Sequence, residues 1–378
     1  MKAAGLIFSN IHDGCIHELT KPRTMASIPF AGRYRLIDFT LSNMVNSDIT
    51  TVGVITHNNY QSLLDHIGTG KDWDLARRSG GIRILPPFIT SSAGPTENKL
   101  YTTRLEALIG VQNFIQHCAE DTIIMADCNM ICNIDFAKAL RQHEKTGADL
   151  TVITKKIDTN DLKFALDSKI DIIKFDNTKR IVDYQEYDNQ SGELYINMNM
   201  IIASRKYLLS VISEAVSRGY RSFTHQVLIK NVSKDKFYAY EYDGYFDYID
   251  SMQKYFYCNM NMLKDDRKEV FNVNNRPIYT KVRNSPPTRY TEGAKVTNSI
   301  IADGCVIEGV VENSILFRGV KVGKGTVVKN CILLQDTYTG EGVYLNCVVT
   351  DKNVTIKKGK MLSGHETLPF FISKGTTV

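Results

Sequence analysis

The chain has 378 residues, of which 43% are hydrophobic and 23% charged, as in globular proteins with one large domain and a smaller one. Its 46 lysines and arginines exceed its 41 aspartates and glutamates by only five and are scattered, which does not favour nucleic acid as a partner. No apolar run approaches the roughly 20 residues that span a bilayer, and the N-terminus lacks the features of a signal peptide, so we expect a cytoplasmic protein without a membrane partner.

Short apolar runs alternate with amphipathic stretches from residue 2 to about residue 262. Buried strands are predicted at 3–8, 51–56, 122–126, 150–156 and 196–203, and helices at 33–46, 103–117 and 135–147. Asp135 can cap the last helix and Gly147 can end it. This alternation predicts an α/β domain with a mostly parallel sheet covered on both faces. Ligands of such sheets lie at the carboxyl ends of the strands, so a nucleotide is expected at the loop after the first strand.

The composition and pattern of the sequence change twice after this domain. Residues 263–292 are rich in polar residues and proline and are predicted to link a domain of residues 1–262 to one of residues 293–378. From residue 293, aliphatic residues recur about every six residues, with glycine, asparagine and aspartate at the turns. Such hexads form one short strand per face of a triangular coil, and stacked coils make a parallel β-helix. The alternative, a β-sandwich, requires strict two-residue alternation and hairpin turns.

Two long stretches, residues 28–56 and 66–87, closely resemble the ADP-glucose pyrophosphorylases. Members of that family make ADP-glucose from ATP and glucose 1-phosphate for glycogen or starch. The resemblance covers essentially the whole chain, because the family joins a Rossmann-like catalytic domain to a C-terminal left-handed β-helix. It implies the same two-part fold here.

The loop after the first strand departs from the family pattern. Where the family has glycines, this chain has Asn10, Ile11 and Asp13; Cys15 replaces an arginine, and Met25 replaces a lysine. Glycines let backbone N–H groups approach the triphosphate, and the arginine neutralises the pyrophosphate leaving group. We therefore expect that ATP does not bind here in the family's pose.

The family's two metal-binding aspartates are also replaced. Asn129 and Tyr248 stand at their positions, and magnesium is held through ionised carboxylates. Asp127 lies two residues before Asn129 on the same face of a strand, and Asp247 and Asp250 lie beside Tyr248. These three carboxylates leave open an alternative in which the chain is an active nucleotidyltransferase with a shifted Mg²⁺ site. Otherwise the resemblance implies no cofactor.

Two further positions have changed residue type. Tyr187 corresponds to the family's sugar-phosphate lysine, and residues 105–109 correspond to the helix start that frames the adenine. Removing one transition-state donor commonly costs about 10²–10³ in rate, so changes at six positions predict a catalytically deficient chain. This pattern resembles the GlgD-type subunit that some bacteria carry beside a catalytic one. The resemblance implies a regulatory role in a heterotetramer with the catalytic ADP-glucose pyrophosphorylase subunit.

The family also binds a phosphorylated sugar effector through cationic side chains between its two domains. The matching residues here are Arg23 and Arg35 in the first domain, and Lys352 and Lys374 in the second. Arginine's planar fork and lysine's point charge both suit phosphate. Two alternatives stay open: that these are ordinary surface cations, and that the chain is a scaffold or acyltransferase unrelated to glycogen. The latter enzymes place a histidine in the coil, whereas His365 lies past the repeats.

Overall fold

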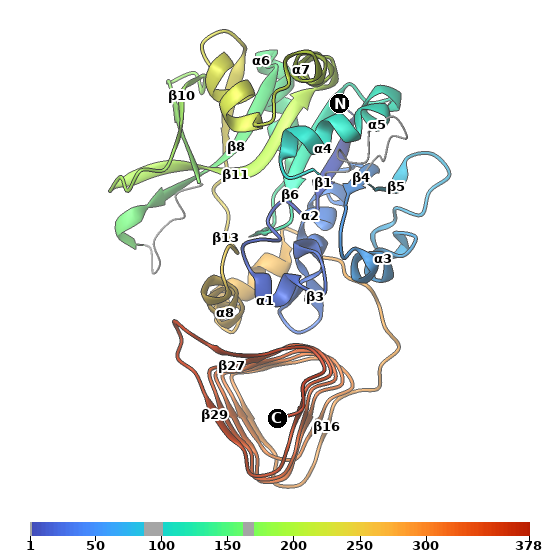
Figure 1. The fold of residues 1–378 in the computed structure, drawn as a ribbon, viewed down its shortest axis with the longest axis vertical. Helices are drawn as coiled ribbons and strands as arrows, with labels where there is room; N and C mark the ends of the chain where they lie inside the picture. The colour runs from blue at the N-terminus through green and yellow to red at the C-terminus, as the bar shows by residue number, and fades with distance from the viewer. Residues whose placement is uncertain (1, 87–100, 162–169) are drawn as a thin grey trace.

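The computed structural model describes residues 2–86, 101–161 and 170–378. An α/β domain occupies one end of the molecule, and a triangular β-helix lies against it at the other end (Figure 1). Within the described ranges, no helix is both long and apolar enough to cross a membrane.

Four parallel strands form the part of the sheet that carries the nucleotide loop in this fold class. They run in the order β6-β1-β4-β5 and are β1 (Ala3–Phe8), β4 (Thr51–Ile55), β5 (Gly81–Leu85) and β6 (Thr122–Asp127). In the register of β1, Phe8 pairs with both Ile55 and Asp127. The loop after β1 therefore lies beside the end of β6, at the carboxyl edge where the sequence predicts the ligand site.

The other part of the sheet is organised around one long strand. β11 pairs antiparallel with β6, β8 and β9, while β12 pairs parallel with β8. The strands here are β8 (Leu150–Asp158), β9 (Asp171–Phe175), β10 (Ile181–Glu186), β11 (Glu193–Ser204) and β12 (Phe237–Glu241). A register shift between Asn197 and Ile201 interrupts β11, and Asn199 there has a left-handed φ of 53°.

Helices cover both faces of the sheet, as predicted. Ala4, Leu6 and Phe8 of β1 pack into a cluster with α4, α5 and α7, whereas Ala3 and Ile7 pack on the opposite face with α2 and α6. The helices of the domain are α1 (His17–Thr20), α2 (Leu36–Val45), α3 (Gln61–Ile67), α4 (Arg104–Gly110), α5 (Gln112–His117), α6 (Phe136–Thr146), α7 (Arg205–Arg218), the π-helix η4 (Thr224–Ile229) and α8 (Met252–Asn261), with 3₁₀ turns η1 (Met25–Ser27), η2 (Lys71–Trp73) and η3 (Thr159–Asp161).

Two helix predictions have different outcomes. The helix predicted at 135–147 is confirmed: the Asp135 carboxylate accepts a hydrogen bond from the Ala137 N–H at 3.0 Å, and Gly147 ends it with φ 57°. The single helix predicted at 103–117 is instead two helices, α4 and α5. They are separated at Val111, whose backbone leaves the helical region directly after Gly110. Glycine is a poor helix former, and periodicity alone did not reveal this break.

The C-terminal part is the predicted left-handed β-helix. Its three faces are parallel five-stranded sheets, ordered β16-β19-β22-β25-β28, β17-β20-β23-β26-β29 and β18-β21-β24-β27-β30. The first sheet comprises Arg289–Tyr290, Val306–Ile307, Lys321–Val322, Tyr338–Thr339 and Thr355–Ile356; the second, Lys295–Thr297, Val310–Glu312, Val327–Lys329, Tyr344–Asn346 and Met361–Ser363; the third, Ile300–Ile301, Ile315–Leu316, Ile332–Leu333, Val348–Thr350 and Phe370–Ile372. Aliphatic side chains fill the coil, which explains the six-residue period of the sequence.

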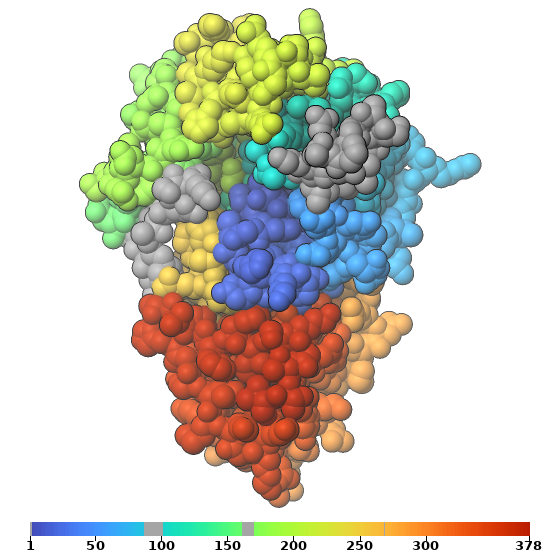
Figure 2. Space-filling model, in the orientation of Figure 1, coloured from blue at the N-terminus to red at the C-terminus, as the bar shows by residue number. Residues whose placement is uncertain are grey.

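The two parts share an apolar cluster rather than meeting only through a linker. Phe30 and Tyr255 of the α/β domain pack in one buried cluster with Ile315, Ile332 and Val349 of the β-helix. The space-filling view shows the β-helix directly against the N-terminal loops (Figure 2). The remaining short elements are β2 (Pro29–Phe30), β3 (Tyr34–Arg35), β7 (Met130–Cys132), β13 (Phe246–Tyr248), α9 (Asp265–Lys268), η5 (Glu269–Phe271), β14 (Asn272–Val273) and β15 (Arg276–Pro277).

Candidate functional site

The loop after β1 is held closed by its own side chains. The side-chain oxygen Oδ1 of Asn10 accepts hydrogen bonds from the Ser9 hydroxyl at 2.7 Å, the Thr56 hydroxyl at 3.0 Å and the His57 N–H at 3.1 Å. The Asn10 amide group donates to the Asp13 carboxylate at 2.7 Å. These bonds tie the loop to the end of β4 and to itself.

The backbone of this loop is also engaged internally. The Asp13 N–H donates to the Asn10 carbonyl at 3.1 Å, and the Cys15 N–H donates to the His12 carbonyl at 3.0 Å. The Asp13 carboxylate accepts from the Met25 N–H at 2.6 Å, and burial raises the pKa of Asp13 to about 6. Two amides of the loop therefore already have partners, and a carboxyl group occupies the turn, which disfavours the binding of a triphosphate.

Asp127, the carboxylate that could hold a metal, is paired with two cationic side chains. It is fully buried at the end of β6, and its Oδ2 lies 2.6 Å from His12 Nε2 and 2.7 Å from Arg104 Nη2. Burial alone would raise the pKa of Asp127, but Arg104 and His12 hold it below its usual range. Burial alone would lower the pKa of His12, but its hydrogen bonds to Asp127 and Cys15 raise it to about 9. Asp127 is therefore an ionised carboxylate whose charge is neutralised from within the chain.

His12 and Arg104 are functional candidates that sequence reasoning missed. His12 lies in the altered loop, and Arg104 is the first residue of α4, with its guanidinium 5.4 Å from the centre of the Phe8 ring. They approach Asp127 from positions 115 and 23 residues away in sequence. The only sequence signal was that both are basic residues next to positions with changed chemistry.

The two family metal positions lie next to each other. β7 pairs with β13, so that Met130 is opposite Tyr248. Directly beside this pair, the Ile249 N–H donates to the Asn129 carbonyl at 2.8 Å, and Asn129 Nδ2 donates back to the Ile249 carbonyl at 3.4 Å. The backbone thus brings these two positions together, with a neutral amide and a phenol where the resemblance to the family implies carboxylates.

The remaining carboxylates do not complete a magnesium site. Asp247 accepts a hydrogen bond from the Tyr245 hydroxyl, and burial raises its pKa. Asp250 pairs with Lys254 at 2.7 Å. Among the described residues, no group of three histidine, cysteine, aspartate or glutamate side chains could hold a metal ion. Since magnesium requires ionised oxygen ligands free of competing cations, this donor set does not suit it.

The residues at the positions expected to contact the sugar phosphate and the adenine make contacts within the protein instead. Tyr187 follows β10, is half-buried and donates its N–H to the Ile170 carbonyl at 2.8 Å. Leu105 and Leu108 of α4 are fully buried in the core of the domain. Neither position presents a cation or an open helix end to a ligand.

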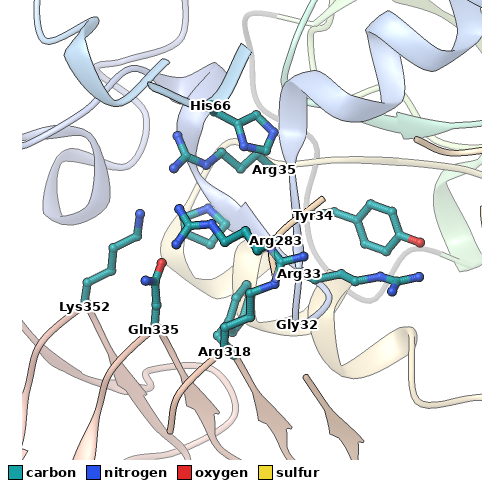
Figure 3. A pocket seen from close by; sticks show the side chains of 11 residues that line it. Gly32, Arg33, Tyr34, Arg35, His66, Arg283, Arg318, Gln335 and Lys352 are labelled. Atoms are coloured by element: carbon teal, nitrogen blue, oxygen red, sulfur yellow. The ribbon is translucent and has the colours of Figure 1, made fainter. Parts of the chain in front are cut away.

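A strongly cationic pocket lies between the α/β domain and the β-helix. It has a volume of about 30 Å³ and opens to solvent. Its lining comprises Pro29, Gly32, Arg33, Tyr34, Arg35, His66, Arg283, Phe317, Arg318, Gln335 and Lys352. Arg35, Arg283 and Lys352 extend toward a common space, whereas Arg33 extends away from it (Figure 3). Arg318 also lines the pocket, and its guanidinium contacts the Asp303 carboxylate at 3.2 Å and donates to the Lys281 carbonyl at 3.3 Å. None of these described lining residues carries a carboxylate.

The pocket concentrates positive charge in a partly buried place. Burial lowers the pKa of Arg35 to about 10, and burial together with Arg35 and Arg23 lowers the pKa of Lys352 to about 7. Arg35 is oriented by hydrogen bonds to the Ser62 carbonyl at 2.5 Å and the Ser62 hydroxyl at 3.0 Å. Arg318 is paired with Asp303 at 3.2 Å, but the mutual repulsion of Arg35 and Lys352 favours an anionic ligand, which would relieve it.

The four cations that the resemblance places in the effector site do not all line the pocket. Arg35 and Lys352 line the pocket, but the guanidinium of Arg23 is buried and contacts both oxygens of Asp351 at 2.7 and 2.9 Å. Lys374 is exposed and outside the pocket lining, although the adjacent Gly375 N–H donates to the Lys352 carbonyl at 3.0 Å. Arg283 and Arg318 join the pocket instead; one lies in the predicted linker and one in a coil, and no local pattern identified them.

Comparisons with known proteins agree with this architecture. Residues 16–266 match the family model described as "Nucleotidyl transferase", and residues 286–367 match the one described as "GlmU-like, C-terminal hexapeptide". The chain is 34% identical to the "Glycogen biosynthesis protein GlgD" of Bacillus subtilis, over 98% of this chain and 95% of that protein. It is 30% identical to a "Glucose-1-phosphate adenylyltransferase" of Mycoplasma mobile, over 83% and 81% of the two chains, and 29% identical to one of Bacillus cereus, over 96% and 94%. The chain therefore belongs to the nucleotidyl transferase family, in the group that contains GlgD and the glucose-1-phosphate adenylyltransferases.

Proposed function

We propose that this chain is a regulatory, catalytically deficient subunit of glucose-1-phosphate adenylyltransferase that acts in glycogen biosynthesis. In this proposal it assembles with a catalytic subunit into a heterotetramer, and the catalytic subunit converts ATP and glucose 1-phosphate into ADP-glucose and pyrophosphate. The names of its relatives, a glycogen biosynthesis protein and glucose-1-phosphate adenylyltransferases, support the pathway. The residues of the nucleotide cleft, by which we mean the loop after β1 and the end of β6, support the absence of turnover.

One observation carries the catalytic part of the proposal. The buried carboxylate of Asp127 is neutralised by His12 and Arg104, while Asn129 and Tyr248 occupy the family's two metal positions. A magnesium-bound triphosphate needs the opposite arrangement, with free carboxylates for the ion and free cations for the phosphates. Changes at several positions of one reaction centre leave little catalysis, even where the individual losses are strongly non-additive.

The cationic pocket supports the regulatory part. Arg35, Arg283, Arg318 and Lys352 surround a space accessible to solvent at the junction of the two domains. Guanidinium groups bind phosphate oxygens bidentately, and a volume of about 30 Å³ accommodates little more than the phosphate group. The effector class that we propose is a phosphorylated sugar whose phosphate enters the pocket and whose ring stays outside it. An anion bound there would contact both domains at once, which gives it a physical means to change their packing.

The test compares the chain alone, the catalytic subunit alone and the two mixed. With ATP, glucose 1-phosphate and Mg²⁺, the chain alone should form no ADP-glucose above background. The mixture should differ from the catalytic subunit in maximal rate or effector response and should elute as one complex. An R35A/K352A double variant should still assemble but lose the effector response. Unchanged activity in the mixture would contradict the regulatory role.

The same assay addresses the alternative that the chain is an active nucleotidyltransferase. If the chain alone forms ADP-glucose in a Mg²⁺-dependent reaction that Asp127→Asn abolishes, Asp127 has a catalytic role despite its two ion pairs. The matched control is Asp121→Asn, which removes an exposed carboxylate paired with Arg205 at 3.0 Å.

A further inference from the structure

A second cavity lies at the junction of the two domains, between α8 and one corner of the β-helix. Its volume is about 230 Å³. The sheet β18-β21-β24-β27-β30 lies between this corner and the cationic pocket, because Asn298 precedes β18 and Gln335 follows β24. Sites for drug-sized ligands span roughly 300–1,000 Å³, so this cavity has room for a single ring.

One wall of the cavity is apolar and belongs to α8 and the turn that follows it. Phe256, Met260 and Leu263 line it. Phe256 and Leu263 also pack in the buried cluster that joins the two domains. Tyr257, Asn261 and Lys264 add polar groups at this side, but the three apolar side chains provide a hydrophobic surface that suits the apolar face of a ligand.

The opposite wall is a ladder of three asparagines on successive coils: Asn298, Asn313 and Asn330. They occupy equivalent positions, since the preceding residues of β17, β20 and β23 pair in register. All three have left-handed backbones, with φ values of 40°, 45° and 51°. Asparagine tolerates this conformation, and its use at three coils places three carboxamides side by side at one edge of the cavity.

The ladder has hydrogen-bonding capacity beyond its internal bonds. Asn298 Nδ2 donates to Asn313 Oδ1 at 2.8 Å, and Asn330 Nδ2 donates to Asn346 Oδ1 at 3.0 Å. Each carboxamide can donate two and accept two hydrogen bonds, so these two bonds use only part of what the ladder offers. The wall therefore presents both donors and acceptors to a ligand.

The charge of the lining further restricts the ligand. Lys264 and Glu366 have opposite signs and are the only charged residues among the described residues that line the cavity. An anionic ligand is thus favoured in the cationic pocket and not here. A nucleobase has two apolar faces, one of which would lie against the amides without hydrogen bonds. A pyranose has one apolar C–H face and a rim of hydroxyls that both donate and accept, which matches the two walls.

We infer that this cavity binds a neutral pyranose, with the C–H face of the ring on α8 and its hydroxyls on the asparagine ladder. The ring is either a free monosaccharide or one residue of an oligosaccharide. Such a ligand bridges α8 and the β-helix, so binding stabilises the packing of the two domains. The site uses neither the nucleotide cleft nor a catalytic subunit, and it is independent of the function proposed above.

Binding can be measured on the full chain by titration calorimetry and by the shift in thermal midpoint. The probes are glucose, maltotriose and adenosine. We expect either saccharide to bind and to raise the midpoint, and adenosine to do neither. Saturation by maltotriose but not by glucose would identify an oligomer as the ligand, and equal binding would identify the single ring.

Two kinds of variant test the location. Asn313→Gly and Asn330→Gly keep the left-handed turns and should weaken saccharide binding at least tenfold. Asn353→Gly is the matched control, since Asn353 has a left-handed φ of 58° at a corner outside the cavity lining, and it should bind as the wild type does. Met260→Trp fills the cavity and should abolish binding while circular dichroism confirms the fold. The inference is overturned if neither saccharide binds, if adenosine binds in their place, or if Asn353→Gly weakens binding as much as Asn313→Gly.

Discussion

Replacing Asp127 by asparagine tests whether the nucleotide cleft is stabilised by its own ion pairs. The substitution keeps the size of the side chain but leaves His12 and Arg104 without the carboxylate at 2.6 and 2.7 Å. Removing one partner of a buried ion pair typically costs about 3–5 kcal/mol. His12 can release its proton to limit the loss, so we expect the lower end, a fall of about 3 kcal/mol in the free energy of unfolding at pH 7.

The pH dependence of stability gives a second, independent measure of the same pairs. Because folding raises the pKa of His12 from 6.5 to about 9, its contribution is fully present below pH 6.5 and is lost as pH rises through about 9. At about 1.4 kcal/mol per pKa unit, this contribution is about 3 kcal/mol. The lowered pKa of Lys352 makes stability rise over part of the same range, but it does so equally in the wild type and in Asp127→Asn. Relative to Asp127→Asn, the wild type should therefore lose about 3 kcal/mol of stability between pH 6.5 and 9.5.

Urea unfolding followed by tryptophan fluorescence measures both effects. Trp73 is the single tryptophan of the chain and is buried in the α/β domain, so it reports on the domain that contains Asp127. Asp121→Asn is the matched control: it breaks an exposed pair and should cost at most about 1 kcal/mol. The interpretation is refuted if Asp127→Asn is as stable as the control, or if the stability profiles of the variant and the wild type have the same slope between pH 6.5 and 9.5.

Three further predictions concern the domain junction and one helix. Lys352, with a pKa of about 7, loses its proton between pH 6 and 8, whereas sulfate keeps its charge over that range. The affinity of the cationic pocket for sulfate, measured by calorimetry, should therefore fall up to about tenfold from pH 6 to pH 8. The affinity of Lys352→Arg should not change over this range. Asp351→Asn leaves Arg23 buried without its partner and should destabilise the chain by about 3–5 kcal/mol in urea unfolding, whereas Asp336→Asn, at an exposed turn, should have little effect. Asp135→Ala removes the cap of α6 and should cost about 1 kcal/mol; a variant as stable as the wild type would show that this cap contributes nothing.

Much of the fold could be predicted from the sequence because its signals are local. The apolar runs at residues 3–8, 51–56 and 122–126 correspond to β1, β4 and β6, and the six-residue period corresponds to the coils of the β-helix. These patterns depend only on which side chains face the interior of one element. The break between α4 and α5 shows the limit of periodicity, since the same apolar spacing suits one long helix or two short ones.

The sequence by itself also determined which residue types occupy the family's catalytic and metal-binding positions. Asn129, Tyr248, Cys15 and Met25 can be identified by alignment alone, since residue type is a property of the chain and not of its packing. The chemistry that these positions exclude follows from the functional groups that they lack.

Only the tertiary structure decided which charges meet. It pairs Asp127 with His12 and Arg104, removes Arg23 from the predicted effector site through Asp351, and brings Arg283 and Arg318 to Arg35 and Lys352. These partners are up to 328 residues apart in the chain. The interaction of two charges depends on the distance between them and on how far water is excluded, and long-range packing sets both quantities.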